Sequence, residues 1–226
     1  MTGKELIEKL HLGAVVYSAY ADSCLLFIYQ KSRGAGYGFY EVSFQKRNFM
    51  HLAGIRSRTM KAERFYEACL NGELTAEDCS PTHDLSNRNA RALILCRLLD
   101  FKDSRLYKIG EVTTVSLYNH IEMATGSSVG IVGYSRHSQG KHPVPTTFLC
   151  EPLSKYSRNP YKIMFVLQKD PSENGYSKLV YEIKKGLFQK ERGWFPAALQ
   201  KMTGQMSVED GIKAAGLDPV DIPREI

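Results

Sequence analysis

Hydrophobic residues follow two different spacings within the first fifty residues. Leu6, Leu10 and Ala14 recur at the spacing of a helix, which predicts an amphipathic helix over residues 3–19. The apolar run 24–30 and the alternating run 40–44 flank a turn rich in glycine, and this pattern predicts a β-hairpin. Three more helical segments are expected, at residues 59–70, from Thr75 and at 90–99.

Short strand-like runs replace the helical pattern after about residue 105. They occupy residues 106–110, 112–117, 129–134, 146–150, 162–168 and 178–183. The links between them are too short for parallel crossovers, so we expect an antiparallel sheet. The chain returns to helix near its end, with a segment at 212–217. The pattern therefore predicts an α+β fold, with N-terminal helices and a β-hairpin followed by an antiparallel sheet. We expect one domain over 1–192 and a short helical C-terminal extension over 193–226.

Composition and charge narrow the class of protein. The 226 residues are 43% hydrophobic and 24% charged, which is ordinary for a globular chain and excludes a disordered or fibrous one. The net charge is +6, and the excess cations lie in residues 1–60 and 151–192. Such basic blocks favour an anionic partner such as nucleic acid. The alternative is that the extra lysines only solvate the surface.

The cysteines and the start of the chain bear on the compartment. Five cysteines are present, without a paired spacing, and several lie in apolar runs, as expected in a reducing environment. The start carries Glu5 and Glu8 where a secretory signal needs positive charge, and the apolar stretch 14–29 is interrupted by Asp22. We expect a cytoplasmic protein without a membrane partner. His137, His142 and Cys150 do not complete a metal-ligand set, so no metal or other cofactor is expected.

Residues 44–54 are the first candidate for chemistry. This segment places Asn48 and His51 after two cations, Lys46 and Arg47, and just before Gly54. An imidazole titrates near neutral pH and suits general acid–base catalysis, while the cations can hold an anion beside it. The alternative is that Asn48 and His51 hydrogen-bond the backbone of a tight turn.

A second candidate covers two turn-rich segments, at residues 134–147 and 151–161. Their cations and hydroxyls alternate with tyrosines, a mixture that contacts phosphates and stacks on unpaired bases. The candidate substrate-binding residues here are Arg136, Lys141, Arg158 and Tyr161, with Thr146, Thr147 and Lys162 nearby. The alternative is a pair of solvated loops.

One string in the first candidate resembles a known family. Phe44, Asn48, His51, Leu52 and Gly54 form a Phe-x-x-x-Asn-x-x-His-Leu-x-Gly string. The string is similar to the signature of phage-associated nucleases of the barnase–EndoU–colicin–RelE-like (BECR) superfamily. The resemblance covers roughly residues 20–185, including the run Tyr-Lys-Ile-Met-Phe-Val-Leu-Gln-Lys at 161–169. It implies an α+β nuclease fold that cuts RNA without a metal, often in phage or toxin settings.

The resemblance also implies roles for particular residues. His51 is expected to be the general base or acid of a transesterification. Thr146 or Thr147 would orient a phosphate oxygen, and Lys141, Arg158 or Lys162 would clamp the phosphate. No second histidine matches the family pattern. A toxin would need an inhibitory antitoxin or immunity protein as a partner. The alternatives are a non-catalytic nucleic-acid-binding protein and a phage structural protein that uses its tail for assembly.

Overall fold

The computed structural model describes residues 3–31, 36–79, 108–113, 121–136 and 140–204. Its helices are α1 (Gly3–Ser18), α2 (Asn48–Leu52), α3 (Ala62–Asn71), α5 (Leu187–Glu191) and α6 (Ala197–Thr203), and its short 3₁₀ turns are Ala76–Asp78, Leu153–Lys155 and Arg192–Trp194. Its strands are β1 (Ser23–Gln30), β2 (Tyr37–Phe44), β3 (Lys108–Glu111), β4 (Met123–Gly126), β5 (Ile131–Ser135), β6 (Val144–Leu149), β7 (Tyr161–Lys169) and β8 (Lys178–Glu182). None of the described helices is both long and apolar enough to cross a membrane.

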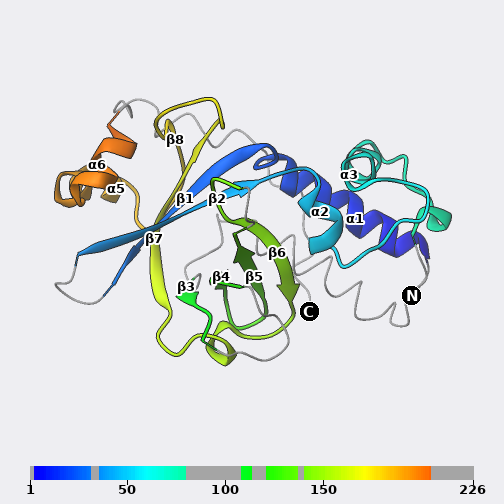
Figure 1. The fold of residues 1–226 in the computed structure, drawn as a ribbon, viewed down its shortest axis with the longest axis horizontal. Coiled ribbons are helices and arrows are strands. Elements are labelled where there is room, and N and C mark those ends of the chain that lie inside the picture. Colours follow the sequence, from blue (N-terminus) through cyan, green and yellow to red (C-terminus); the bar gives the residue numbers. More distant parts are fainter. Residues whose placement is uncertain (1–2, 32–35, 80–107, 114–120, 137–139, 205–226) are drawn as a thin grey trace.

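The strands form one curled antiparallel sheet in the order β2-β1-β7-β3-β4-β5-β6 (Figure 1). Strands β3 and β8 share one edge of β7, with β3 on its first residues and β8 on Phe165–Gln168. The curl brings the two ends of this order together, because the Ser43 N–H of β2 donates to the Pro143 carbonyl just before β6, at 2.8 Å. The α+β class and the antiparallel sheet predicted from the sequence are therefore confirmed.

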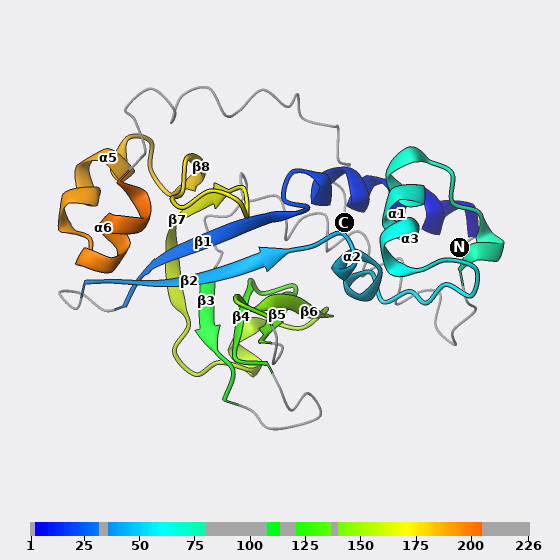
Figure 2. The same cartoon turned by 45° about the horizontal axis from the view of Figure 1, so that its top comes forward.

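The alternation of side chains along β1, β2 and β7 divides the core into two clusters. Phe27, Val42 and Val166 point to the inner face of the curl and join the large cluster that includes α1 and α3. Leu26 and Phe165 point to the outer face. The short helices α5 and α6 cover that face with apolar side chains, and Figure 2 shows them at the opposite end of the molecule from α1 and α3.

Several expected elements are confirmed, with shifts of a few residues. The helix expected at 3–19 is α1, the hairpin is β1–β2, and the helix expected at 59–70 is α3. Gly72 ends α3 in a left-handed conformation with φ of +70° that glycine adopts without strain. The capping box predicted at Thr75 is present and opens a single 3₁₀ turn.

Among the middle strands, one prediction differs from the structure and one strand was missed. The strand expected at 112–117 is absent from its described part, because Val112 and Thr113 follow the end of β3 and lie outside any strand. Strand β4 was not predicted, since its sequence Met-Ala-Thr-Gly has little β-propensity and depends on pairing with β3 and β5. The helices expected at 90–99 and 212–217 lie outside the described residues.

Tyr17 of α1 fixes the turn that leads from β2 to α2. Its buried ring packs against Phe44, Phe49 and Tyr66, with ring centres 5.4–5.8 Å apart. Its hydroxyl donates a hydrogen bond of 2.8 Å to the Gln45 carbonyl. The aromatic cluster and this bond together determine where α2, and therefore His51, lies on the sheet.

Replacing Tyr17 with Phe is expected to lower the free energy of unfolding by about 1 kcal/mol, because the ring keeps its packing but the hydrogen bond to Gln45 is lost. Urea denaturation measures this difference. The matched control is Ser18→Ala on the same helix, whose exposed hydroxyl bonds the Val15 carbonyl. The control should change the free energy by less than about 0.5 kcal/mol. Equal effects of the two variants would contradict the role given to Tyr17.

Candidate functional site

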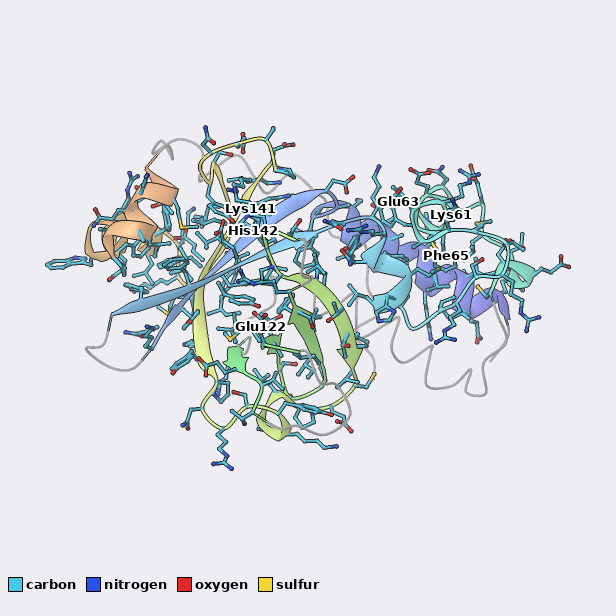
Figure 3. All side chains as sticks on the ribbon, in the orientation of Figure 1. Lys61, Glu63, Phe65, Glu122, Lys141 and His142 are labelled. Atoms are coloured by element: carbon cyan, nitrogen blue, oxygen red, sulfur yellow. The ribbon has the colours of Figure 1, made fainter. Side chains whose placement is uncertain are left out.

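The closure of the sheet places His142 beside Glu41 of β2. The His142 Nδ1 lies 3.8 Å from a Glu41 carboxylate oxygen, and the two side chains are 17% and 22% exposed. His142 immediately precedes Pro143, whose carbonyl accepts the bond from Ser43. In Figure 3 the labelled Lys141 and His142 lie over the central strands, away from Lys61 on the side of α3.

The strand register gives Glu41 a cation as well. Lys169, Cys24 and Ser43 are direct partners across β7, β1 and β2, and Glu41 lies two residues before Ser43 on the same outer face. The Lys169 ammonium therefore reaches to 3.8 Å from the second Glu41 carboxylate oxygen, and its side chain is only 11% exposed. Glu41 thus lies between an ammonium group and an imidazole.

Tyr176 donates a hydrogen bond to the same carboxylate. Its side chain is fully buried, and its hydroxyl donates a 2.9 Å hydrogen bond to Glu41. The Lys169 ammonium lies 4.9 Å from the centre of its ring. Burial, followed by the Glu41 charge and hydrogen bond, raises the pKa of Tyr176, so the hydroxyl stays a donor at physiological pH. Its backbone N–H donates to the Met202 carbonyl of α6 at 2.8 Å, which ties this residue to the C-terminal helices.

The surroundings of His142 favour its neutral form. Burial is the largest influence and lowers the pKa of His142; the Glu41 charge opposes this, and Lys141, Lys169 and Arg136 add to it. A neutral imidazole next to a carboxylate can accept a proton, and the carboxylate then stabilises the imidazolium. The group can therefore act as a general base with cations around it that attract an anion.

Two of the cations predicted from the sequence, Lys141 and Arg136, lie close enough to His142 to influence its pKa. Lys141 is exposed next to His142, and Arg136 follows the end of β5 with its Nε 4.0 Å from Glu122. Tyr40 lies close to the same pair, since burial first and Glu122 second raise its pKa. Its hydroxyl is buried without a hydrogen bond to any residue that the structure describes.

The structure places His51 on the exposed face of α2, whose other face buries Phe49 and Leu52. Within the described ranges, its imidazole makes no hydrogen bond or ion pair. Asn48 hydrogen-bonds the backbone of the turn, which is the alternative that the sequence left open for it: its Oδ1 accepts the Gln45 N–H at 3.1 Å. The catalytic role of His51 stays a prediction.

The other sequence-derived candidates near α2 and β6 have local partners. Lys46 lies 3.6 Å from Asp22 and 3.8 Å from Glu67, and the Arg47 Nε donates to the Gln45 side chain at 2.7 Å. On β6, the Thr146 hydroxyl is 2.9 Å from the Ser135 hydroxyl. Thr147 is half-buried opposite Gly133.

Three further candidates lie away from the Glu41–His142 pair: Arg158, Tyr161 and Lys162. Lys162 precedes Lys169 by seven residues along β7, a separation of roughly 20 Å for an extended strand. Tyr161 stacks on Tyr29 with ring centres 5.2 Å apart and planes inclined by 19°. The structure therefore divides the cations predicted from the sequence between two ends of the sheet.

Sequence reasoning missed Glu41, Lys169 and Tyr176. It noted His142 as an incomplete metal ligand and as a histidine of the second candidate segment, without giving it a catalytic role. One signal was present, because Glu41 is the single charged residue of β2, a strand rich in aromatic side chains. Its partners lie more than 100 residues away in the chain, and only the register of β1, β2 and β7 brings them together.

Comparison with known proteins shows which family the chain matches. The family described as phage-Barnase-EndoU-ColicinE5/D-RelE like nuclease 4 matches residues 9–185. The match contains Glu41, His142, Lys169 and Tyr176, and it ends before α5 and α6. No curated protein and no solved structure matches the chain.

An NMR titration is expected to give His142 a pKa below its ordinary 6.5. Glu41→Gln should lower this pKa further, whereas Lys169→Gln should raise it, because the two charges act in opposite directions. Since the folded-state pKa is below the unfolded value, the native state binds fewer protons. His142 therefore makes stability fall as the pH drops below about 6.5. Shifts of the same sign in both variants would contradict this arrangement.

Proposed function

Because the chain belongs to the phage-Barnase-EndoU-ColicinE5/D-RelE like nuclease 4 family, we propose that it cleaves RNA without a metal ion. The observation that carries this proposal is the His142–Glu41 pair, which combines a proton acceptor with a carboxylate in a basic environment. RNA supplies its own nucleophile in the 2′-hydroxyl, so such a pair can start the reaction.

The reaction is a transesterification. His142 removes the 2′-hydroxyl proton, and the oxygen attacks the adjacent phosphorus. The bond from phosphorus to the 5′-oxygen breaks, and an acid protonates that oxygen, leaving a 2′,3′-cyclic phosphate and a 5′-hydroxyl. Glu41 stabilises the imidazolium that forms on His142, while Lys141 and Arg136 offset the negative charge that develops on the phosphate.

We propose His51 as the acid that protonates the 5′-oxygen. It comes from α2, which packs against β6, the strand that begins two residues after His142 (Figure 1). Thr146 or Thr147 on the same strand would donate a hydrogen bond to a phosphate oxygen. Asn48, Lys46 and Arg47 would contact the substrate next to His51.

The setting of the reaction is part of the same proposal. A ribonuclease acting in the cytoplasm would damage the RNA of the cell that makes it. We therefore propose that the protein acts there as a toxin-type nuclease under the control of an antitoxin or immunity protein.

His142→Ala is expected to reduce cleavage of labelled RNA by about 100-fold or more, because the base is lost. Glu41→Gln should reduce it by roughly 10- to 100-fold, since the carboxylate acts only through the imidazole. Cleavage is measured by gel electrophoresis of the products in EDTA. Replacement of the 2′-hydroxyl by hydrogen at the cut position should abolish the reaction.

The control for this experiment is Lys61→Gln together with Glu63→Gln, two exposed residues at the start of α3 (Figure 3). The control should cleave at the rate of the unchanged protein. Full activity of His142→Ala would refute the role of His142. RNA retardation without cleavage would favour the non-catalytic nucleic-acid-binding alternative.

His51→Ala tests the acid separately. The rate should fall by about 100-fold on RNA with an ordinary 5′-oxygen leaving group. It should fall far less on RNA with a 5′-sulfur leaving group at the cut position, because a thiolate departs without a proton. An equal loss on both substrates would assign His51 a role other than proton donation.

A further inference from the structure

Two lysines face each other at the end of β7 that is remote from Glu41. Lys108 of β3 is the direct cross-strand partner of Lys162 of β7, and both side chains are exposed. Side chains in such a pair have Cβ atoms about 5 Å apart. In the part of the chain that the structure describes, neither lysine side chain has a hydrogen bond or an ion pair.

Arg158 is brought to the same place by a close crossing of the chain. A Cβ on Gly110 of β3 would overlap the side chain of Ser157 and lie 3.3 Å from the Pro160 Cα. Only glycine lets the segment from Ser157 to Pro160 lie this close to the strand. Arg158 lies in this segment and is exposed. Its backbone is therefore held beside Gly110, which is two residues from Lys108 on β3.

The nearest acidic residue on β3 points away from these cations. Glu111 lies three residues after Lys108, so the alternation of the strand directs it to the opposite face. Its charge acts there on Tyr29, which stacks on Tyr161. On the face of the lysines, the neighbour of Lys162 across β1 is the uncharged Gln30.

Like charges placed directly opposite each other destabilise a strand pair. A bound polyanion would reverse this effect, because it neutralises the lysines and releases its own counterions. We propose that Lys108, Lys162 and Arg158 form a second binding surface that holds the phosphate backbone of a single-stranded RNA. The identity of the strand as RNA rests on the proposed function, while the surface itself does not.

The surface is separate from the Glu41–His142 pair. Lys162 pairs with Gln30, and Gln30 lies four residues from Leu26, the partner of Glu41, which is about 13 Å along the strand. Two further strands separate Lys108 from Glu41 across the sheet. The cations occupy a patch one strand pair wide, which fits successive phosphates of one strand better than the two backbones of a duplex.

The test is binding of a single-stranded RNA of about 16 nucleotides, with 2′-O-methyl groups that block cleavage. Affinity is measured by fluorescence anisotropy over a series of salt concentrations. Lys108→Gln with Lys162→Gln should weaken binding roughly tenfold and reduce the slope of log affinity against log salt by about 1.4. Lys108→Arg with Lys162→Arg should keep the original slope.

The matched control is Lys4→Gln with Lys61→Gln, which removes two exposed charges from α1 and from the start of α3. An unchanged slope in the Lys108/Lys162 glutamine variant, or an equal loss in the control, would overturn the proposal. Relief of the repulsion should also leave the melting temperature unchanged or higher, so weaker binding with a lower melting temperature would contradict it. A duplex that loses as much affinity as the single strand would refute the preference for single strands.

The outcome is independent of the cleavage experiments. If His142→Ala cleaves RNA normally while the lysine variant loses affinity, the catalytic proposal fails and the binding surface stands. If cleavage depends on His142 and the lysine variant binds normally, the reverse holds.

Discussion

The backbone hydrogen bond from Ser43 to Pro143 is the contact on which the candidate site depends. It joins the first and last strands of the curled sheet, and each of its partners lies beside a residue of the site. Glu41 is two residues before Ser43, and His142 immediately precedes Pro143. A sheet of the same strands left open would separate the carboxylate from the imidazole, so the pairing of Glu41 with His142 follows from the curl of the backbone.

The polar cluster around Glu41 is stable because its groups form hydrogen bonds and ion pairs with one another. A half-buried carboxylate alone would be costly, but Glu41 accepts the Tyr176 hydroxyl and lies near Lys169 and His142. The same burial that makes the carboxylate depend on these partners lowers the pKa of His142. The contacts that stabilise the fold around Glu41 therefore also govern the charge state of His142.

Local patterns predicted the fold better than the site. Alternation and turn chemistry were sufficient for α1, the β1–β2 hairpin and the antiparallel sheet, because each depends on neighbouring residues. The string around His51 identified the nuclease family, which the match over residues 9–185 confirms. The grouping of Glu41, Lys169 and Tyr176 could not be predicted, since it requires the register of three strands. Lys162 was an alternative to Lys141 as the phosphate clamp, and its place near the start of β7 puts it at the other end of the sheet from Lys169.

The bond from the Tyr176 N–H to the Met202 carbonyl has a consequence for how this protein can be divided. Residues beyond 185 lie outside the nuclease match, yet Phe188, Phe195 and Leu199 share an apolar cluster with Leu26 and Phe165. A fragment cut at the family boundary would leave the outer face of the sheet bare and Tyr176 without its anchor. The packed unit that contains the sheet is consequently longer than the segment matched by the family.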